Sequence, residues 1–498
     1  MTECVFYAYG CSFIYVYVLS QVEFVGLKNN AMSSQNNLMG GPINLKEERQ
    51  RNMTVSWFKK RENSLFLTPY IKRGNLDEAR RLSYVELFSR AAGAAAHSGY
   101  ITVDKEFSSN LFFLLIRAKE SPSTAPLLLW LQGGPGLSSL FGQFLEVGPV
   151  GIDASGKIFP RKLTIQQRMN IIFLDEPVGA GFSYTTSLQG LAYSLDEVSN
   201  DMLEFLQQFI LLFPEFKDRD FYVAGESYGA RYTVGISHLL HKERKKKVVP
   251  LNLRGLICGV GFLGPILEVA DSAEFLFQNS MITERGRSQF ATRFSRLRTT
   301  AKFSESMALL LLMRTIFTSD LKPTLFQRLT GYQNHASTLY SHKPPHMTAY
   351  EKYVQTRDFK RAVHVGSAVK FENNMTKLML GLKADYLTDI TPRITDLLNN
   401  YKVLFYTGQM DALFPSVNQQ KFYRTLEWKG AKAFQKQSRE EWMAGEGSKH
   451  LAGYKTQVGN FTEMVLIKAG HYAAVDVPEV TYHMMAEFFG YTDERKKL

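Results

Sequence analysis

The sequence predicts an α/β fold in which a mostly parallel central sheet carries helices on both faces. Short apolar runs followed by turn residues alternate with longer helical stripes along most of the chain. Residues 126–131 and 170–174 are apolar without interruption, which is typical of strands buried on both faces. Residues 195–213 instead carry apolar side chains at the spacing of a helix stripe. With 498 residues, 45% of them hydrophobic, the chain can bury a large core.

The individual elements follow from the same patterns. Residues 100–103 and 111–117 are predicted to form a β-hairpin at the start of the sheet. The further strands are expected at residues 126–131, 170–174, 221–224, 253–258, 402–406 and 464–467. Between Pro265 and Pro392 the alternation stops, and charged, helix-forming segments such as 304–317 predict an inserted helical cap.

The predicted organisation therefore has five segments. Residues 1–20 form a candidate signal peptide, because residues 4–19 are apolar, although no positive charge precedes them. Residues 21–64 are polar and aperiodic, and we expect a mobile leader there. The sheet domain is expected at residues 65–265 and 393–498, interrupted by the cap at 266–392.

The net charge of +12 raises the question of a polyanionic partner. The densest basic cluster, residues 242–247, follows a predicted helix and is either a nucleic-acid or membrane patch or a solvated helix end. No nucleic-acid-binding signature accompanies it, and no run of 18 apolar residues occurs in the body of the chain. We expect no nucleic-acid partner, no membrane span, no metal and no cofactor.

The cysteines and the N-terminus point to different compartments. The chain has only three cysteines, so no disulfide framework can form in the folded body, which favours the cytosol. Cys258 lies in an apolar run and is expected to be buried rather than reactive. The candidate signal peptide and three glycosylation tripeptides, at Asn52, Asn374 and Asn460, favour the secretory pathway, with a lysosomal, vacuolar or extracellular destination.

Residues 225–229, Gly-Glu-Ser-Tyr-Gly, match the G-x-S-x-G pattern of a nucleophile elbow. The pentapeptide follows a predicted strand and opens a predicted helix, as the elbow of an α/β-hydrolase requires. The glycines permit a tight turn, and the helix N-terminus places backbone N–H groups beside Ser227. The sequence therefore predicts an α/β-hydrolase fold with Ser227 as its nucleophile.

A serine nucleophile needs a base and an orienting acid, which follow in this fold in the order Ser, Asp, His. Asp411 and His471 occur in that order, each just past the end of a predicted strand. Loops at the carboxyl ends of parallel strands form the site in open α/β sheets. The glycine turn at residues 133–136 also ends a predicted strand and could direct N–H groups at an oxyanion.

Several longer stretches resemble the serine carboxypeptidase family, and most of all its vitellogenic-like branch. They occur in the order expected of that family, from about residue 65 to the C-terminus. The stretches are WLQGGPGLSS (130–139), NIIFLDEPVGAGFSY (170–184), GESYGARY (225–232), YTGQMD (406–411) and AGH (469–471), with LTPYIK (67–72), RAVHVG (361–366) and WKG (428–430) as further matches.

The resemblance implies a role for each matching residue. Ser227 would be the nucleophile, His471 the general base and then acid, and Asp411 the residue that orients the imidazole. The backbone N–H groups of Gly134 and Tyr228 would form the oxyanion hole. The substrate's C-terminal carboxylate would be bound by Gln132, Gly133, Glu146 and Glu226.

Two adjacent glutamates and the substrate carboxylate that they face cannot all be charged at once. At least one of them must keep its proton and donate a hydrogen bond. We therefore expect peptides with a free carboxylate to bind more tightly at mildly acidic pH, and substrates with a blocked C-terminus to retain activity to higher pH.

The chain departs from the family pattern in four respects. Gly229 and Ala230 exchange the small residues of the usual G-E-S-Y-A-G order, and packing behind the serine is expected to survive. Leu137 replaces a cysteine that many members pair, and the disulfides common in the cap are absent. Tyr472 replaces the methionine that follows the histidine and helps shape the leaving-group pocket.

The sequence therefore predicts a serine carboxypeptidase that releases C-terminal amino acids through an acyl-enzyme, is favoured by acidic pH, and is a candidate homodimer. Two alternatives remain open on the same fold. One is a catalytically weak scaffold or binding protein, which the altered residues after His471 suggest. The other is an esterase or acyltransferase that uses the same triad.

Overall fold

The computed structural model describes residues 64–318, 322–372, 375–445 and 447–491. The candidate signal peptide, all of the leader before Ser64, and the glycosylation candidates Asn52 and Asn374 lie outside the described residues. Asn460 is exposed in the turn between strands β11 and β12, so its side chain is accessible from solvent.

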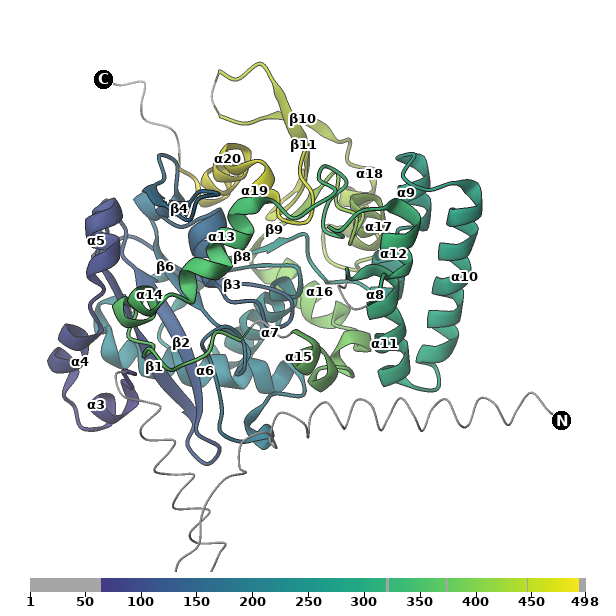
Figure 1. The fold of residues 1–498 in the computed structure, drawn as a ribbon. Coiled ribbons are helices and arrows are strands. Elements are labelled where there is room, and N and C mark those ends of the chain that lie inside the picture. The colour runs from purple at the N-terminus through teal and green to yellow at the C-terminus, as the bar shows by residue number, and fades with distance from the viewer. Residues whose placement is uncertain (1–63, 319–321, 373–374, 446, 492–498) are drawn as a thin grey trace, which may run out of the picture. The chain divides into compact units, whose positions relative to one another are not determined.

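A ten-stranded sheet organises the chain in the order β1-β2-β6-β3-β7-β8-β9-β12-β11-β10 (Figure 1). The six strands from β6 to β12 in this order pair in parallel, and antiparallel pairs extend the sheet at both edges. The strands are β1 (Ala96–Asp104), β2 (Ser109–Ile116), β3 (Leu127–Leu131), β6 (Asn170–Leu174), β7 (Asp220–Glu226), β8 (Asn252–Gly259), β9 (Lys402–Gly408), β10 (Glu440–Met443), β11 (Leu451–Val458) and β12 (Phe461–Leu466). A separate pair consists of β4 (Val150–Ile152) and β5 (Ile158–Pro160).

Strand β3 shows why its sequence is apolar throughout. Its five residues are all buried, and successive side chains point to opposite faces of the sheet. Leu127, Leu129 and Leu131 join one hydrophobic core, while Leu128 and Trp130 join the other. The prediction of strands buried on both faces is therefore confirmed.

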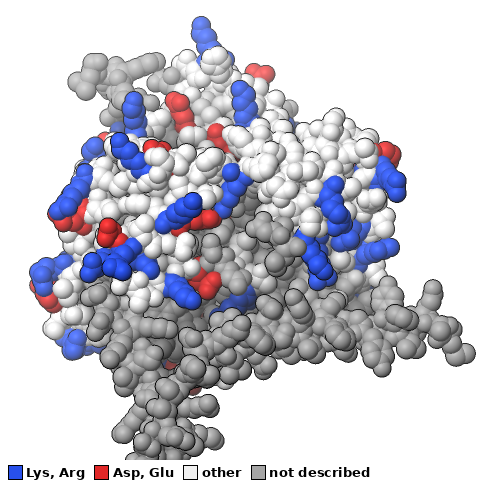
Figure 2. All heavy atoms as spheres, viewed as in Figure 1, with Lys and Arg blue, Asp and Glu red and all other residues white. Residues whose placement is uncertain are grey.

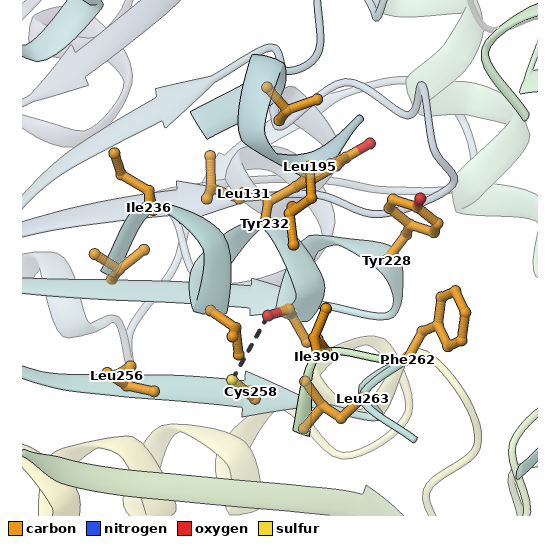
Figure 3. Packing of buried hydrophobic residues seen from close by; sticks show 14 of the residues in the cluster. Leu131, Leu195, Tyr228, Tyr232, Ile236, Leu256, Cys258, Phe262, Leu263 and Ile390 are labelled. Atoms are coloured by element: carbon orange, nitrogen blue, oxygen red, sulfur yellow. Dashed lines mark hydrogen bonds between the residues drawn. The ribbon is translucent and has the colours of Figure 1, made fainter. Parts of the chain in front are cut away.

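Helices cover both faces of the sheet. On one face, α6 (Leu195–Leu212), α7 (Tyr228–Glu243) and α16 (Thr391–Asn400) pack against one another. Figure 3 shows this core from close by, with Tyr232 and Ile236 of α7 beside Leu131 of β3 and Leu256 of β8. The other core includes α5 (Glu86–Ala92), η1 (Gly142–Glu146), α13 (Pro345–Val354), α19 (Ala473–Asp476) and α20 (Pro478–Phe489).

Helix α6 starts where its sequence predicts. The Ser194 side chain accepts a hydrogen bond from the backbone N–H of Glu197, and acidic residues occupy the first turn. The other helices of the sheet domain are α3 (Thr68–Lys72), α4 (Leu76–Ser83), η2 (Ile165–Gln167), η3 (Leu188–Gly190), η4 (Pro214–Phe216), α17 (Ser416–Tyr423) and α18 (Ala431–Lys436).

The described residues between β8 and β9 form helices and loops without a strand, where the sequence predicts a cap. Besides α13 and α16 they comprise α8 (Ile266–Val269), α9 (Ala273–Gln278), α10 (Glu284–Ala301), α11 (Glu305–Ile316), α12 (Leu325–Thr330), α14 (Arg357–Ala362), α15 (Met375–Gly381) and η5 (Asp385–Leu387). Helix α16 contains the predicted boundary at residue 392 and packs on α7. The domain boundaries therefore stay predictions.

The surface is charged with both signs. On the face in Figure 2, lysine and arginine side chains are spread over many elements, with acidic side chains among them. The basic cluster at 242–247 lies at the end of α7, where Lys242 and Lys246 are exposed and Lys246 pairs with Glu243 at 2.8 Å. Across the described ranges, no helix is long and apolar enough to span a bilayer.

Candidate active site

Ser227 occupies a sharp turn between β7 and α7. Its backbone has φ 56° and ψ −122°, an unusual conformation for a residue other than glycine. The turn is fixed by two backbone hydrogen bonds, from Ser227 N to Gly259 O at 2.9 Å and from Phe262 N to Ser227 O at 3.0 Å. The end of β8 thus holds the serine in a conformation that would be strained in isolation.

Steric contacts explain why glycine occupies the two positions that flank the turn, Gly225 and Gly229. A Cβ atom at Gly225 would lie 2.2 Å from the carbonyl oxygen of Gly229. A Cβ atom at Gly229 would lie 2.2 Å from the carbonyl oxygen of Leu131, the last residue of β3. The exchanged pair is therefore packed well, as expected, but its two positions are not interchangeable in this chain.

Gly229→Ala is expected to destabilise the fold, because its methyl group would force β3 and α7 apart. Overpacking of this kind costs about 2 kcal/mol or more. Ala230→Gly is the matched control, since glycine in a helix costs only about 1 kcal/mol relative to alanine. Chemical denaturation gives the free energy of unfolding of each variant, and equal losses in the two would contradict the close approach of Gly229 to Leu131.

Asp411 and His471 meet at the carboxyl ends of β9 and β12. The Nδ1 atom of His471 lies 2.9 Å from Oδ2 of Asp411, and both side chains are buried. The other carboxylate oxygen of Asp411 accepts backbone N–H bonds from Leu413 at 2.8 Å and Phe414 at 2.9 Å. The carboxylate is thus fixed on both oxygens and holds the imidazole ring in one orientation.

The insert between β8 and β9 also contacts this pair. The backbone N–H of His471 donates to Ala336 O at 2.8 Å, and that of Thr338 donates to Met410 O at 3.0 Å. Burial, with a smaller contribution from the nearby His471, lowers the pKa of the adjacent His335 to about 3, so His335 stays neutral. Sequence reasoning missed this segment because it carries no recognisable motif.

The glycine turn after β3 lies directly against the nucleophile elbow. A Cβ atom at Gly133 would be 2.7 Å from Glu226 O and 2.9 Å from Tyr228 N. Gly134 has a φ of 115°, which favours glycine. The structure therefore brings the two backbone segments that contain Gly134 and Tyr228 into contact.

The predicted carboxylate-binding residues are also buried together. Glu146 ends the short helix η1, and Glu226 ends β7 immediately before Ser227. The Tyr406 hydroxyl donates to Glu226 Oε1 at 2.5 Å. The side-chain oxygen of Gln132 accepts from the indole N–H of Trp130 at 3.0 Å, which leaves the Gln132 amino group to donate elsewhere. Tyr406 lies within a stretch that carries the resemblance, but nothing in the sequence assigns it this contact.

One glutamate of this pair holds a proton more firmly than usual. Burial raises the pKa of the Glu146 carboxyl well above its ordinary value, and the charge of Glu226 raises it further. The Arg161 guanidinium and the Gln132 amide oppose this shift. Burial also lowers the pKa of Arg161 to about 10, so this arginine stays charged beside Glu146. The raised pKa lets Glu146 keep its proton to higher pH than an ordinary glutamate, so under mildly acidic conditions this carboxyl can donate a hydrogen bond.

Tyr472 lies near both the Glu146–Glu226 pair and the Asp411–His471 pair. Its ring centroid lies 5.0 Å from that of Phe141 and 5.5 Å from that of His471. Glu146, Glu226 and Asp411 all lie within electrostatic range of its hydroxyl. The buried glutamates and the Asp–His pair are therefore both within electrostatic range of Tyr472.

The fold and this site define a serine hydrolase of the α/β-hydrolase type. The sequence profile of the serine carboxypeptidase family, described as "Serine carboxypeptidase", matches residues 88–490. The chain belongs to that family, as its sequence motifs predict.

Curated relatives agree over most of the chain. A human protein named "probable serine carboxypeptidase CPVL" is 34% identical over 85% of this chain and 89% of the relative. The venom serine carboxypeptidase of Apis mellifera is 32% identical, covering 85% of this chain and 90% of the relative. The vitellogenic carboxypeptidase of Aedes aegypti is 30% identical, covering 85% and 89%. The prediction of a serine carboxypeptidase of the vitellogenic-like branch is therefore confirmed at the level of the family.

A solved structure supports the fold. Kex1 from Saccharomyces cerevisiae, described as a prohormone-processing carboxypeptidase, aligns with a TM-score of 0.68 at 19% identity. The alignment covers 82% of this chain and 96% of Kex1. The predicted α/β-hydrolase architecture is confirmed.

Proposed function

We propose that this chain is an exopeptidase in which Ser227, His471 and Asp411 form the catalytic triad. The observation that carries the proposal is a buried Asp–His pair together with a buried pair of glutamates, with Tyr472 within electrostatic range of their carboxyl groups. The Asp–His pair supplies the base that a serine nucleophile needs. The glutamates supply a site for the carboxylate that marks a peptide's C-terminus.

The reaction follows from these positions. Ser227 Oγ attacks the last peptide carbonyl while His471 accepts the hydroxyl proton. The oxyanion receives hydrogen bonds from the N–H groups of Gly134 and Tyr228. The C–N bond then breaks, His471 protonates the leaving amine, and an acyl-enzyme remains on Ser227. Water attacks this ester with His471 as base, and the shortened peptide leaves.

The carboxylate site selects the chain end. The protonated Glu146 carboxyl, the Gln132 amino group and the Gly133 N–H would donate to the substrate's terminal carboxylate. Glu226 accepts from Tyr406 and lies beside the nucleophile. An internal peptide bond presents no carboxylate to these donors, so cleavage is restricted to the last residue.

An N-blocked tripeptide tests this proposal by mass spectrometry. The expected result is release of single amino acids from the C-terminus, first one and then the next, and no release by the Ser227→Ala variant. Turnover of blocked esters without release from the tripeptide would support the esterase or acyltransferase alternative. Absence of turnover for both substrates, in folded protein that binds the peptide, would support the binding-protein alternative.

Glu146→Gln is expected to flatten the pH dependence of peptide KM. As the pH rises through the raised pKa of Glu146, the wild-type carboxyl loses its proton and repels the substrate carboxylate, so KM increases. Glutamine cannot ionise, and the KM of the variant towards neutral pH should be about 10-fold below that of the wild type.

The matched control is Glu463→Gln, in β12, where burial likewise raises the pKa of a glutamate. This variant should keep the wild-type profile of KM against pH. A Glu146→Gln profile that coincides with the wild-type profile would show that Glu146 does not carry the acid dependence.

We also propose peptides with a free C-terminus as the substrates and the secretory pathway as the location, on the strength of the candidate signal peptide and the exposed Asn460. The relative from Apis mellifera is named as a venom protein, which is consistent with secretion. The candidate homodimer stays a prediction.

A further inference from the structure

The short turn η5 (Asp385–Leu387) of the insert contacts the nucleophile elbow through a buried acid. Asp385 is 4% exposed, and its carboxylate accepts hydrogen bonds from the Tyr228 hydroxyl and from Arg231 Nε, the latter at 2.7 Å. Arg231 Nη2 also donates to the carbonyl oxygens of Asp385 and Thr388, each at 2.6 Å. The first turn of α7 is thus bound to the insert by side chains and backbone together.

The next residue of the same turn contacts the other side of the site. The Tyr386 hydroxyl donates to the carbonyl oxygen of Gly134 at 3.4 Å, and the Tyr386 side chain is buried. Its ring centroid lies 5.0 Å from that of Tyr228 and 5.4 Å from that of Phe262. Figure 3 shows Tyr228, at the start of α7, and Phe262, which follows β8; their ring centroids lie 5.5 Å apart. The Arg231 guanidinium packs 4.9 Å from the Phe262 ring.

Two consecutive residues therefore bind the two backbone segments whose N–H groups form the proposed oxyanion hole. We propose that the η5 turn is the positioning element of this hole, with Asp385 fixing Tyr228 and Tyr386 fixing Gly134; the inference rests on the proposed function. Neither side chain touches the reacting atoms. Each acts through the residue that it holds.

The charges around Asp385 favour a lasting contact between the η5 turn and α7. Burial raises the pKa of the Tyr228 hydroxyl well above its ordinary value, and Asp385 raises it further, so the hydroxyl remains a donor. The Arg231 guanidinium compensates the buried charge of Asp385. The insert is thereby coupled to the geometry of the catalytic step, because any shift of η5 would move both donors relative to Ser227.

Tyr386→Phe and Tyr228→Phe each remove one hydroxyl and keep the buried ring. A displacement of the order of 1 Å at a catalytic group can cost up to about 100-fold in rate. We expect the loss of one anchor to lower the rate of Ser227 labelling by a fluorophosphonate, and the affinity for a peptide aldehyde, about 10-fold each. The aldehyde adds Ser227 Oγ and presents an oxyanion to the hole. A single free amino acid, the product of C-terminal cleavage, does not bind in the oxyanion hole, so its inhibition constant should be unchanged.

Tyr491→Phe is the matched control, because it removes a tyrosine bond to a backbone carbonyl, Arg168 O at 3.0 Å, remote from the elbow. It should match the wild type in all three measurements. Unchanged labelling and aldehyde affinity in both test variants would overturn the proposal. Equal losses of aldehyde and amino-acid affinity would also overturn it, since they would indicate a general structural defect.

The same experiment separates this inference from the proposed function. Labelling of Ser227 in wild-type protein that releases no amino acid from peptides would contradict the peptidase assignment. The comparison of labelling rates between Tyr386→Phe and Tyr491→Phe would still decide whether η5 positions the oxyanion hole.

Discussion

Replacing Ser227 with alanine is expected to lower kcat for peptide hydrolysis by about a million-fold. The triad acts as a unit, so loss of the nucleophile removes the covalent route and leaves only the contribution of substrate binding and the oxyanion hole. Ser227 is half-buried at the N-terminus of α7, and its replacement by alanine removes only the side-chain oxygen, so we expect the fold to be retained. Release of the C-terminal amino acid, followed by chromatography, measures the change.

Peptide affinity should persist in this variant, because the proposed carboxylate site does not include the serine. A peptide KD close to the wild-type KM, together with an unchanged denaturation midpoint, would show that only the chemical step is lost. Residual activity above about one hundredth of the wild type would contradict the role of Ser227 as nucleophile.

Asp411→Asn is expected to lower kcat by about 10⁴-fold. In the wild type, Asp411 accepts a hydrogen bond from the Nδ1–H group of His471, which leaves Nε2 unprotonated and free to accept the serine proton. Asparagine can turn its amino group towards Nδ1, which would place the imidazole proton on Nε2 and block proton transfer from Ser227. Side-chain volume hardly changes, so the fold should be retained.

Asp476→Asn, at the end of α19 and five residues after His471, provides the control for Asp411→Asn. Asp476 Oδ2 accepts the backbone N–H of Gly470 at 2.7 Å but does not bond to the imidazole, and the asparagine oxygen can replace that acceptor. We expect kcat to change less than about 10-fold. If both variants lost activity equally, Asp411 would be acting through loop structure and not through the tautomer of His471.

The sequence predicts those parts of the structure that depend on local pattern. The uninterrupted apolar run at β3 identifies a strand buried on both faces, and the glycines around Ser227 indicate a tight strand–helix turn. The edge strands β10 and β11 were missed, because β10 exposes three of its four residues and lacks an apolar signature. Strands of this kind are specified by their neighbours in the sheet.

The contacts that complete the site arise from long-range packing. Tyr228 and Asp385 are 157 residues apart, and Tyr386 and Gly134 are 252 residues apart. No local pattern indicates that these segments meet. The pairing of Tyr406 with Glu226 likewise depends on the approach of β9 to the end of β7 across β8.

The most direct test of the account compares one N-blocked dipeptide with its C-terminal amide, at mildly acidic and at neutral pH. We predict that the wild-type protein releases the C-terminal amino acid from the free acid with an acid-favoured kcat/KM, and that the amide is a poorer substrate at acidic pH but loses less activity towards neutral pH. Equal kcat/KM for the two substrates at both pH values would contradict the account, because the buried Glu146–Glu226 pair would then have no part in recognising the substrate's C-terminus.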